Sequence, residues 1–222
     1  MIGILDYGCG NLKSVQNALS ALKVPWQMVN DPDQVDQVNQ LILPGVGAFG
    51  VAMQKLQPFI PALSEAKERG IPILGICLGM QLLCTGSEED GGHLGLNFIP
   101  ADVKRFTVEK LKVPHMGWNT LNIEQSSGLM SGLKQGSDVY FVHSYCVACK
   151  QEEDVLAKTD YGQSFVSAFQ RGNVAGVQFH PEKSQKVGLT ILRNFVGVTH
   201  VEEAVDRRDH STGWSSSSKR AV

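Results

Sequence analysis

The sequence predicts an α/β fold in which helices flank a doubly wound, mostly parallel sheet that carries an additional antiparallel portion. In the first half, short apolar runs alternate with stretches of helical periodicity. Glycine-rich loops follow several of these runs, at the places where a parallel sheet forms its binding crevice. In the second half, apolar runs follow one another without helices between them, which favours antiparallel pairing.

The first strand covers residues 2–6 and ends in the loop YGCGN. A helix follows, with Leu12, Val15, Leu19 and Leu22 at helical spacing, until Val24-Pro25 breaks the pattern. Further strands are predicted at residues 26–29, 41–43 and 71–76, with a helical stretch ending at residue 69 between the last two. We expect YGCGN, the loop PGVGAFG and the turn at Cys77 to converge in space.

Four strands are predicted in the second half, at residues 138–145, 155–159, 164–170 and 173–180, with Arg171-Gly172-Asn173 as a hairpin turn. Ser184 is positioned to cap a closing helix that carries Val187, Ile191 and Phe195 on one face. We therefore predict one domain over residues 1–198. Residues 199–222 are charged and serine-rich and are predicted to form a mobile tail.

Composition excludes several classes of protein. The chain has 222 residues, 42% of them hydrophobic, and its 20 basic and 22 acidic side chains leave no broad positive field for nucleic acid or an anionic membrane. No basic leader precedes the first apolar run, and no run is long enough to span a bilayer, so we expect a cytoplasmic protein. An odd count of 5 cysteines argues against a disulfide framework.

Cys77 lies in the segment Gly75-Ile-Cys-Leu-Gly79, between an apolar strand and a helix, which is the geometry of a nucleophile elbow with cysteine in place of serine. The helix N-terminus favours the thiolate, and the backbone N–H of Leu78 becomes one oxyanion-hole donor. A lone cysteine is more often a small buried hydrophobic residue. The context of a second motif decides between the two interpretations.

That motif is Gly176-Val-Gln-Phe-His-Pro-Glu182, where a strand ends with an imidazole and a carboxylate two residues apart. Alone, His180 would be interpreted as structural and Glu182 as a surface residue. Together with Cys77 they supply a nucleophile, a base and the group that orients the base, in chain order. The sequence therefore predicts a Cys-His-Glu triad.

The loop Pro44-Gly-Val46-Gly47 leaves a parallel strand beside the elbow, and its glycines allow a backbone N–H to turn toward a developing negative oxygen. We expect it to supply the second oxyanion donor, although a simple strand-to-helix turn is the alternative. YGCGN fails the dinucleotide fingerprint because Lys13 stands where the third glycine would be. Cys146 and Cys149 form a lone CxxC without the partners of a zinc site, so neither a metal nor a cofactor is expected.

Taken together, GICLGMQLL and GVQFHPEKS resemble the triad class of glutamine amidotransferases, and DYGCGNLKSV, PGVGAFG, VPHMGWN and YFVHSY resemble the glutaminase subunits of imidazole glycerol phosphate synthases. The resemblance covers residues 1 to about 198 and implies a class I amidotransferase-like, flavodoxin-like fold. It implies that Cys77 attacks the carboxamide of glutamine, His180 transfers protons and Glu182 holds the imidazole tautomer.

The resemblance also assigns further roles. Val46, Gly47 and Leu78 would form the oxyanion hole, and Gln81, Ser144 and Tyr145 would bind the substrate L-glutamine. Gln81 has an ordinary helix residue as its alternative. Asn11, Trp118, Asn119, Tyr140 and Lys183 would face the partner subunit, although Asn11 is equally suited to cap the first helix and the PHMGWN segment is also interpretable as core. His143 is expected to give structural support and His93 to be exposed.

By the same resemblance, the partner is a (β/α)8-barrel cyclase that forms a heterodimer with this chain, uses the ammonia and makes imidazole glycerol phosphate and aminoimidazole carboxamide ribonucleotide in histidine biosynthesis. The alternatives are a glutaminase that serves another acceptor, a free-standing γ-glutamyl hydrolase, and a non-catalytic interaction module. Met80 and PHMGWN argue against the first two, since relatives serving other synthases usually carry histidine where Met80 stands. The intact triad argues against the third.

Overall fold

The parallel half of the sheet is built from the apolar runs of the first half of the chain and one strand from the second. The computed structural model describes residues 1–109, 111–126 and 128–197, so the predicted tail lies outside the described residues. Five strands pair in the order β2-β1-β3-β4-β13, all parallel. They are β1 (Ile2–Leu5), β2 (Trp26–Val29), β3 (Gln40–Gly45), β4 (Ile73–Cys77) and β13 (Val174–Val177).

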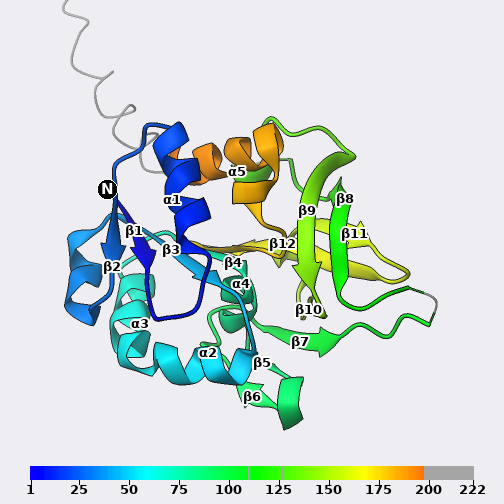
Figure 1. Ribbon diagram of the computed structural model, residues 1–222, viewed down its shortest axis with the longest axis horizontal. Coiled ribbons are helices and arrows are strands. Elements are labelled where there is room, and N and C mark those ends of the chain that lie inside the picture. The colour runs from blue at the N-terminus through cyan, green and yellow to red at the C-terminus, as the bar shows by residue number, and fades with distance from the viewer. Residues whose placement is uncertain (110, 127, 198–222) are drawn as a thin grey trace, which may run out of the picture.

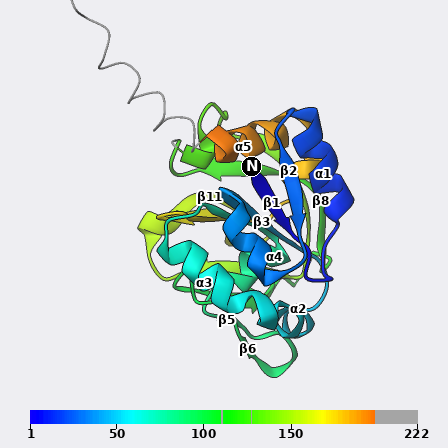
Figure 2. The same cartoon turned by 90° about the vertical axis from the view of Figure 1, so that its left-hand side faces the viewer.

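Helices cover both faces of this sheet, as Figures 1 and 2 show: α1 (Leu12–Ala21) and α5 (Gln185–Gly197) lie on one side, and α2 (Phe49–Leu56) and α3 (Ile60–Glu68) on the other. Side chains alternate between two cores accordingly. Ile42 and Ile76 pack with Leu19 of α1 and Ile191 of α5, whereas neighbouring strand residues such as Leu43 pack under α2 and α3. Apolar burial on both faces explains why these strands are nearly continuous hydrophobic runs.

The rest of the chain after α4 (Leu78–Leu82) adds mostly antiparallel strands. β12 (Ser164–Arg171) pairs with β13, and β10 (Tyr145–Cys149), β7 (Ala101–Arg105), β5 (Gly86–Ser87) and β6 (His93–Leu94) extend the sheet outward, with β5 parallel to β7. A branch leaves through β11 (Val155–Asp160), β8 (His115–Ile123) and β9 (Ser137–His143), seen on the right of Figure 1. The predicted α/β fold with an antiparallel portion is confirmed.

Several details differ from the sequence prediction. The strand predicted at residues 138–145 is two strands, because the chain leaves the β8 ladder at Ser144 and β10 pairs with β7 and β12 instead. The strand predicted at 173–180 ends at Val177. The helical stretch before residue 69 is broken into α2, a short 3₁₀ turn (Gln57–Phe59) and α3. The Ser184 hydroxyl, expected to cap α5, bonds instead to the backbones of Tyr140 and His180.

Strand register brings the predicted catalytic segments together. β4 lies between β3 and β13, with Gly45 opposite Cys77 and Val177 opposite Ile76. All three strands run in the same direction, so the segments that follow them meet at one edge of the sheet. The 3₁₀ turn Pro181–Lys183, which follows β13, and α4 (Leu78–Leu82), which follows β4, are therefore neighbours of the loop after β3. None of the described helices is long and apolar enough to cross a membrane.

Candidate active site

Cys77 ends β4 in a strained backbone conformation, with φ 55° and ψ −111°, and α4 begins at the next residue. Such a turn projects the side chain at the top of the sheet. It also brings α4 against β3: a Cβ added to Gly79 would lie 1.8 Å from the carbonyl oxygen of Leu43, so no larger residue fits there. Strain of this kind in a non-glycine residue is found mainly at functional sites.

His180 and Glu182 form a buried pair beside the thiol. His180 Nδ1 lies 2.8 Å from Glu182 Oε1, and the two side chains are 5% and 2% exposed. Burial lowers the pKa of His180, but a hydrogen bond to Cys77 and the hydrogen bond to Glu182 outweigh it and raise the pKa to about 9. Because Nδ1 is occupied by Glu182, Nε2 is the ring nitrogen available to Cys77. The pair therefore favours imidazolium next to the thiol at neutral pH.

A cavity of about 500 Å³ opens over Cys77. The residues predicted from the sequence as nucleophile, base, oxyanion hole and substrate contacts all line it, whereas Glu182 lies behind His180 and does not. The lining also contains residues that the sequence reasoning did not select. The full set is Val46, Gly47, Cys77, Leu78, Gln81, Glu89, Arg105, Pro114, Val142, His143, Ser144, Tyr145, His180 and Lys183.

The three glycine-rich segments converge in space, as predicted, although only the PGVGAFG loop and the turn at Cys77 line the cavity. The hydroxyl of Tyr7, in the YGCGN loop, donates to the carbonyl of Pro44 over 2.9 Å. A Cβ on Gly45 would lie 2.8 Å from both that hydroxyl and the backbone nitrogen of Gly79, so the three loops pack without space between them. Beyond this anchored end, Val46 is 44% exposed and Gly47 has φ +109° with open space around it. The loop thus has one fixed end and one open end.

Gln81 is buried one helical turn after the nucleophile. Its Nε2 donates to the carbonyl of Tyr145 over 3.1 Å and to Oε1 of Gln178 over 3.0 Å. Gln178 Nε2 lies 3.8 Å from Cys77 Sγ, within the range of a weak hydrogen bond to sulfur. Gln178 is part of the GVQFHPE motif, but the sequence reasoning assigned it no role, because only strand pairing shows that it points toward the thiol.

Glu89 and Arg105 were also missed. Both line the cavity, near the 3₁₀ turn Glu89–Gly91, which contacts α2 and β7, and Glu89 Oε2 accepts a hydrogen bond from the backbone N–H of Phe49 over 2.7 Å. They lie in segments whose sequence shows neither a motif nor a clear periodicity. A local signal for them is absent, since their position depends on how the added strands pair with β10.

Four of the five residues expected at a partner interface, all except Asn11, lie on or near β8 and β9. Trp118 is 50% and Met116 63% exposed, and Trp118 contacts the ring of Tyr140 edge to face. Lys183 Nζ lies 5.9 Å from the centre of the Tyr140 ring and also lines the cavity. Asn119 alternates to the other face of β8, where its amide bonds to His115 and to the carbonyl of Asp160. Their role at an interface stays a prediction.

The remaining positions singled out in the sequence do not line the cavity over Cys77. Asn11 occupies the N-cap position of α1 but its side chain makes no capping hydrogen bond. His93, expected to be exposed, is half-buried against the ring of Phe49. All five cysteines are free, and burial raises the pKa of Cys146 to about 11 and that of Cys149 to about 12. Among the described residues no cluster of His, Cys, Asp and Glu is suited to hold a metal ion.

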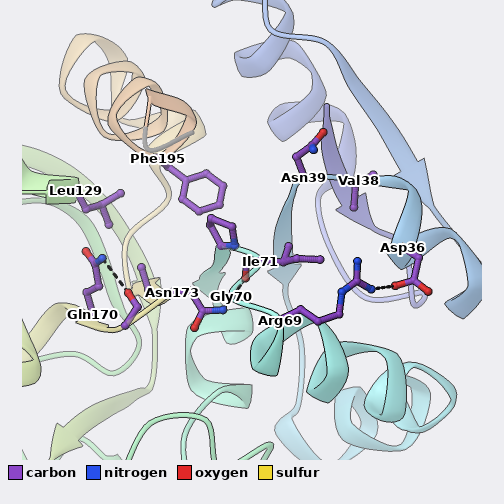
Figure 3. Close-up of a pocket in the computed structure, with 13 residues that line it drawn as sticks. Asp36, Val38, Asn39, Arg69, Gly70, Ile71, Leu129, Gln170, Asn173 and Phe195 are labelled. Atoms are coloured by element: carbon purple, nitrogen blue, oxygen red, sulfur yellow. Dashed lines mark hydrogen bonds and ion pairs between the residues drawn. The ribbon is translucent and has the colours of Figure 1, made fainter. Parts of the chain in front are cut away.

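A second cavity, of about 680 Å³, lies at the opposite ends of the parallel strands (Figure 3). Arg69 forms an ion pair with Asp36 there, and the Asn173 amide bonds to the carbonyls of Lys67 and Ile71. Its lining contains no nucleophile and no buried acid or base. Of these two cavities, the one over Cys77 therefore holds the groups suited to covalent catalysis.

Comparison with known proteins agrees with this geometry. Residues 3–198 match the family model of class I glutamine amidotransferases. The chain is 50% identical over 196 residues to the imidazole glycerol phosphate synthase subunit HisH of Moorella thermoacetica, covering 87% of this chain and 93% of the relative. It is 49% identical over 203 residues to subunit HisH of Syntrophotalea carbinolica, covering 88% and 98%. A solved glutamine amidotransferase shares the fold, with TM-score 0.69 and 20% identity, covering 90% of this chain and 98% of that chain.

Proposed function

The chain belongs to the class I glutamine amidotransferases and, within them, to the HisH subunits of imidazole glycerol phosphate synthase, and from this premise we propose that it hydrolyses glutamine at Cys77 and passes the ammonia to a cyclase subunit. The observation that carries this proposal is the buried His180–Glu182 pair beside a strained cysteine at a nucleophile elbow. A binding module would have no use for a costly backbone conformation and a buried ionisable pair at the same place.

In the first half of the reaction, the Cys77 sulfur, which has given its proton to His180, attacks the carboxamide carbon of glutamine. The imidazolium of His180 already carries a proton, which Nε2 delivers to the leaving nitrogen as the carbon–nitrogen bond breaks, so that ammonia leaves and a glutamyl thioester remains. Glu182 keeps Nδ1–H oriented throughout. The backbone N–H groups of Leu78 and of the Val46–Gly47 segment would stabilise the negative oxygen of the tetrahedral intermediate.

In the second half, water attacks the thioester carbon. Neutral His180 accepts a proton from that water, the carbon–sulfur bond breaks, and glutamate leaves with Cys77 and His180 returned to their starting state. The lining of the cavity offers one carboxylate, Glu89, and, besides His180, the two cations Arg105 and Lys183 for the amino acid end of the substrate. We assign the ammonium group of glutamine to the side of Glu89 and its carboxylate to the side of Arg105, with Gln81, Ser144 and Tyr145 forming the wall between them and the thiol.

A separate acceptor subunit is supported by the relatives that are about half identical to this chain, each of which is named as one subunit of a synthase. We propose that this subunit is the (β/α)8-barrel cyclase of histidine biosynthesis, and that the two chains form a heterodimer. The exposed Met116 and Trp118 support an interface at this position, together with Tyr140 beside Trp118 and with Lys183, which lines the cavity. A free thiol nucleophile suits the reducing cytoplasm, which is the proposed location.

Labelling with a glutamine-analogue electrophile, such as a chloroketone, tests the proposed function. We expect selective alkylation of Cys77, protection by glutamine, and no modification of the buried Cys84 under the same conditions. Capture of the tagged chain from its native cell would then identify the acceptor. Alkylation that glutamine does not slow, or a co-purifying synthase other than a cyclase, would contradict the respective part of the proposal.

A further inference from the structure

Two histidines that the proposed mechanism does not use face each other across the β8–β9 ladder. His115 and His143 are register partners, and His115 Nδ1 lies 3.1 Å from His143 Nε2. The other nitrogen of His143, Nδ1, lies 2.8 Å from the carbonyl oxygen of Tyr145. The other nitrogen of His115, Nε2, lies 3.3 Å from the amide nitrogen of Asn119. Both imidazoles are buried.

The surroundings of the two rings keep them neutral. His115 lies between the rings of Tyr161 and Phe141, with centroids 4.0 Å and 4.8 Å away, and Phe106 contacts both histidines. Burial lowers the pKa of His115 to about 4 and that of His143 to about 3. Each ring therefore carries a single N–H at neutral pH.

One N–H on each ring fixes the direction of every hydrogen bond in the series. The Tyr145 carbonyl can only accept, so His143 donates from Nδ1 and its Nε2 must accept. His115 then donates from Nδ1, and its Nε2 accepts from Asn119. The second amide hydrogen of Asn119 donates to the carbonyl of Asp160 over 2.9 Å. In this one arrangement the hydrogen-bonding groups of Asn119, His115 and His143 all have partners. Every hydrogen bond from Asn119 through the two histidines then points toward the Tyr145 carbonyl.

The series continues to the nucleophile. The Tyr145 carbonyl accepts from both His143 and Gln81, which uses both of its lone pairs. Gln81 donates its second amide hydrogen to Gln178 Oε1, and Gln178 directs its own amide nitrogen at the Cys77 sulfur. Hydrogen bonds thus run without a break from Asn119, beside the exposed Trp118, to Cys77 Sγ.

We propose that Gln178 and the His115–His143 pair are positioning residues for glutamine hydrolysis: Gln178 holds the Cys77 sulfur, and the histidine pair holds the Tyr145 carbonyl and Gln81 against the substrate. This inference deepens the proposed glutaminase function and rests on it. Amide donation to sulfur stabilises the thiolate more than the thiol, so Gln178 acts on the reactivity of the nucleophile. The histidine pair acts on the wall of the cavity, and so on the binding of glutamine.

The two parts of the network predict different kinetic changes, which a purely structural role would not produce. Gln178→Met is close in shape and removes the amide, and we expect it to lower kcat for glutamine by roughly 10- to 100-fold with little change in KM. It should also slow alkylation of Cys77 by iodoacetamide at neutral pH and move the pH profile of that alkylation upward. His143→Phe should instead raise KM for glutamine by about 10-fold and leave alkylation unchanged.

Two further variants separate positioning from stability. His143→Phe leaves the His115 N–H without an acceptor, and the double variant His115→Phe/His143→Phe removes both polar partners, so thermal stability should recover in the double variant while KM stays raised. Thr159→Val is the matched control: its hydroxyl bonds to the carbonyl of Thr120 in the same branch of the sheet, outside the network. It should lower the melting temperature without changing KM or the alkylation profile.

The measurements use the full chain for alkylation and its complex with the partner subunit for glutamate release. Recovery of KM together with stability in the double histidine variant would overturn the role of the histidines. Alkylation of Gln178→Met with the wild-type rate and pH profile would overturn the role of Gln178. A wild-type complex that releases no glutamate from glutamine would overturn the proposed function instead, and the alkylation profile would still decide the contact between Gln178 and Cys77.

Discussion

Replacing Glu182 by glutamine tests how the buried carboxylate sets the charge of the catalytic imidazole. The amide keeps the shape of the side chain and a hydrogen bond to His180 Nδ1, which lies 2.8 Å from Glu182 Oε1, but it removes the negative charge. Burial then lowers the pKa of His180 without the negative charge of Glu182 to oppose it. We expect the pKa of His180 to fall from about 9 toward or below its ordinary value of 6.5.

The expected size of the effect follows from linkage. The rise from 6.5 to about 9 corresponds to about 3 kcal/mol at about 1.4 kcal/mol for each pKa unit. Because the folded-state pKa of His180 is raised, this stabilisation is fully present below pH 6.5 and is lost as the pH rises through about 9. In a domain of this size, about 3 kcal/mol corresponds to roughly 6–12 °C in melting temperature.

The assay is thermal unfolding of wild type and Glu182→Gln between about pH 6.5 and pH 9.5, with NMR titration of the His180 imidazole. The wild-type melting temperature should fall by roughly 6–12 °C more than that of the variant over this range. Tyr7 and the buried thiols, whose pKa values are raised by burial, also make stability depend on pH. Their contributions are the same in both proteins, so they cancel when the two changes in melting temperature are subtracted. Equal losses of stability, or an imidazole that still titrates near pH 9 in the variant, would refute the reasoning.

Three further predictions concern the loop, the buried histidines and the tail. Gly47→Ala, at φ +109°, should lower glutamine turnover by the complex about 100- to 1000-fold, because the substitution misplaces an oxyanion donor. We also expect this loop to turn its donor toward the oxyanion only when the partner subunit binds, so the wild-type chain alone should be comparably slow, and a fast isolated chain would contradict this. The unfolding free energy should fall as the pH drops from 6.5 through about 4, because burial lowers the pKa values of His115 and His143, and the double phenylalanine variant should lose this dependence in a chemical denaturation series. Removing residues 199–222 should change neither melting temperature nor turnover, and a large drop in melting temperature would show that they pack on the domain.

The parallel half of the fold was predictable because its signals are local. Strands buried on both faces appear as short apolar runs, and the helices between them show their own periodicity. β8 was missed for a physical reason. Its inward and outward residues alternate as in any half-buried strand, but the outward ones include Met116 and Trp118, which are apolar and exposed. The period of two was therefore hidden by exposed apolar side chains.

The same distinction holds for the candidate site. Cys77, His180 and Glu182 were selected because a thiol at an elbow and an imidazole two residues from a carboxylate are recognisable in the chain itself. Gln178, Glu89 and Arg105 became visible only with the strand pairing that brings them to the cavity. The two histidines show the limit most clearly: His115 and His143 are 28 residues apart, and only the β8–β9 register makes them partners.

Product formation by the complex, with glutamine or with ammonium salt as the nitrogen source, tests the central claim most directly when wild type and Cys77→Ala are compared. Only the nucleophile for deamidation is removed by the substitution, and the acceptor chemistry belongs to the other subunit. We predict that Cys77→Ala abolishes synthesis from glutamine and leaves synthesis from ammonium salt at the wild-type rate. Continued use of glutamine by Cys77→Ala would contradict the triad, and failure of both nitrogen sources to support synthesis by the wild-type complex would contradict the proposed transfer of ammonia to a cyclase.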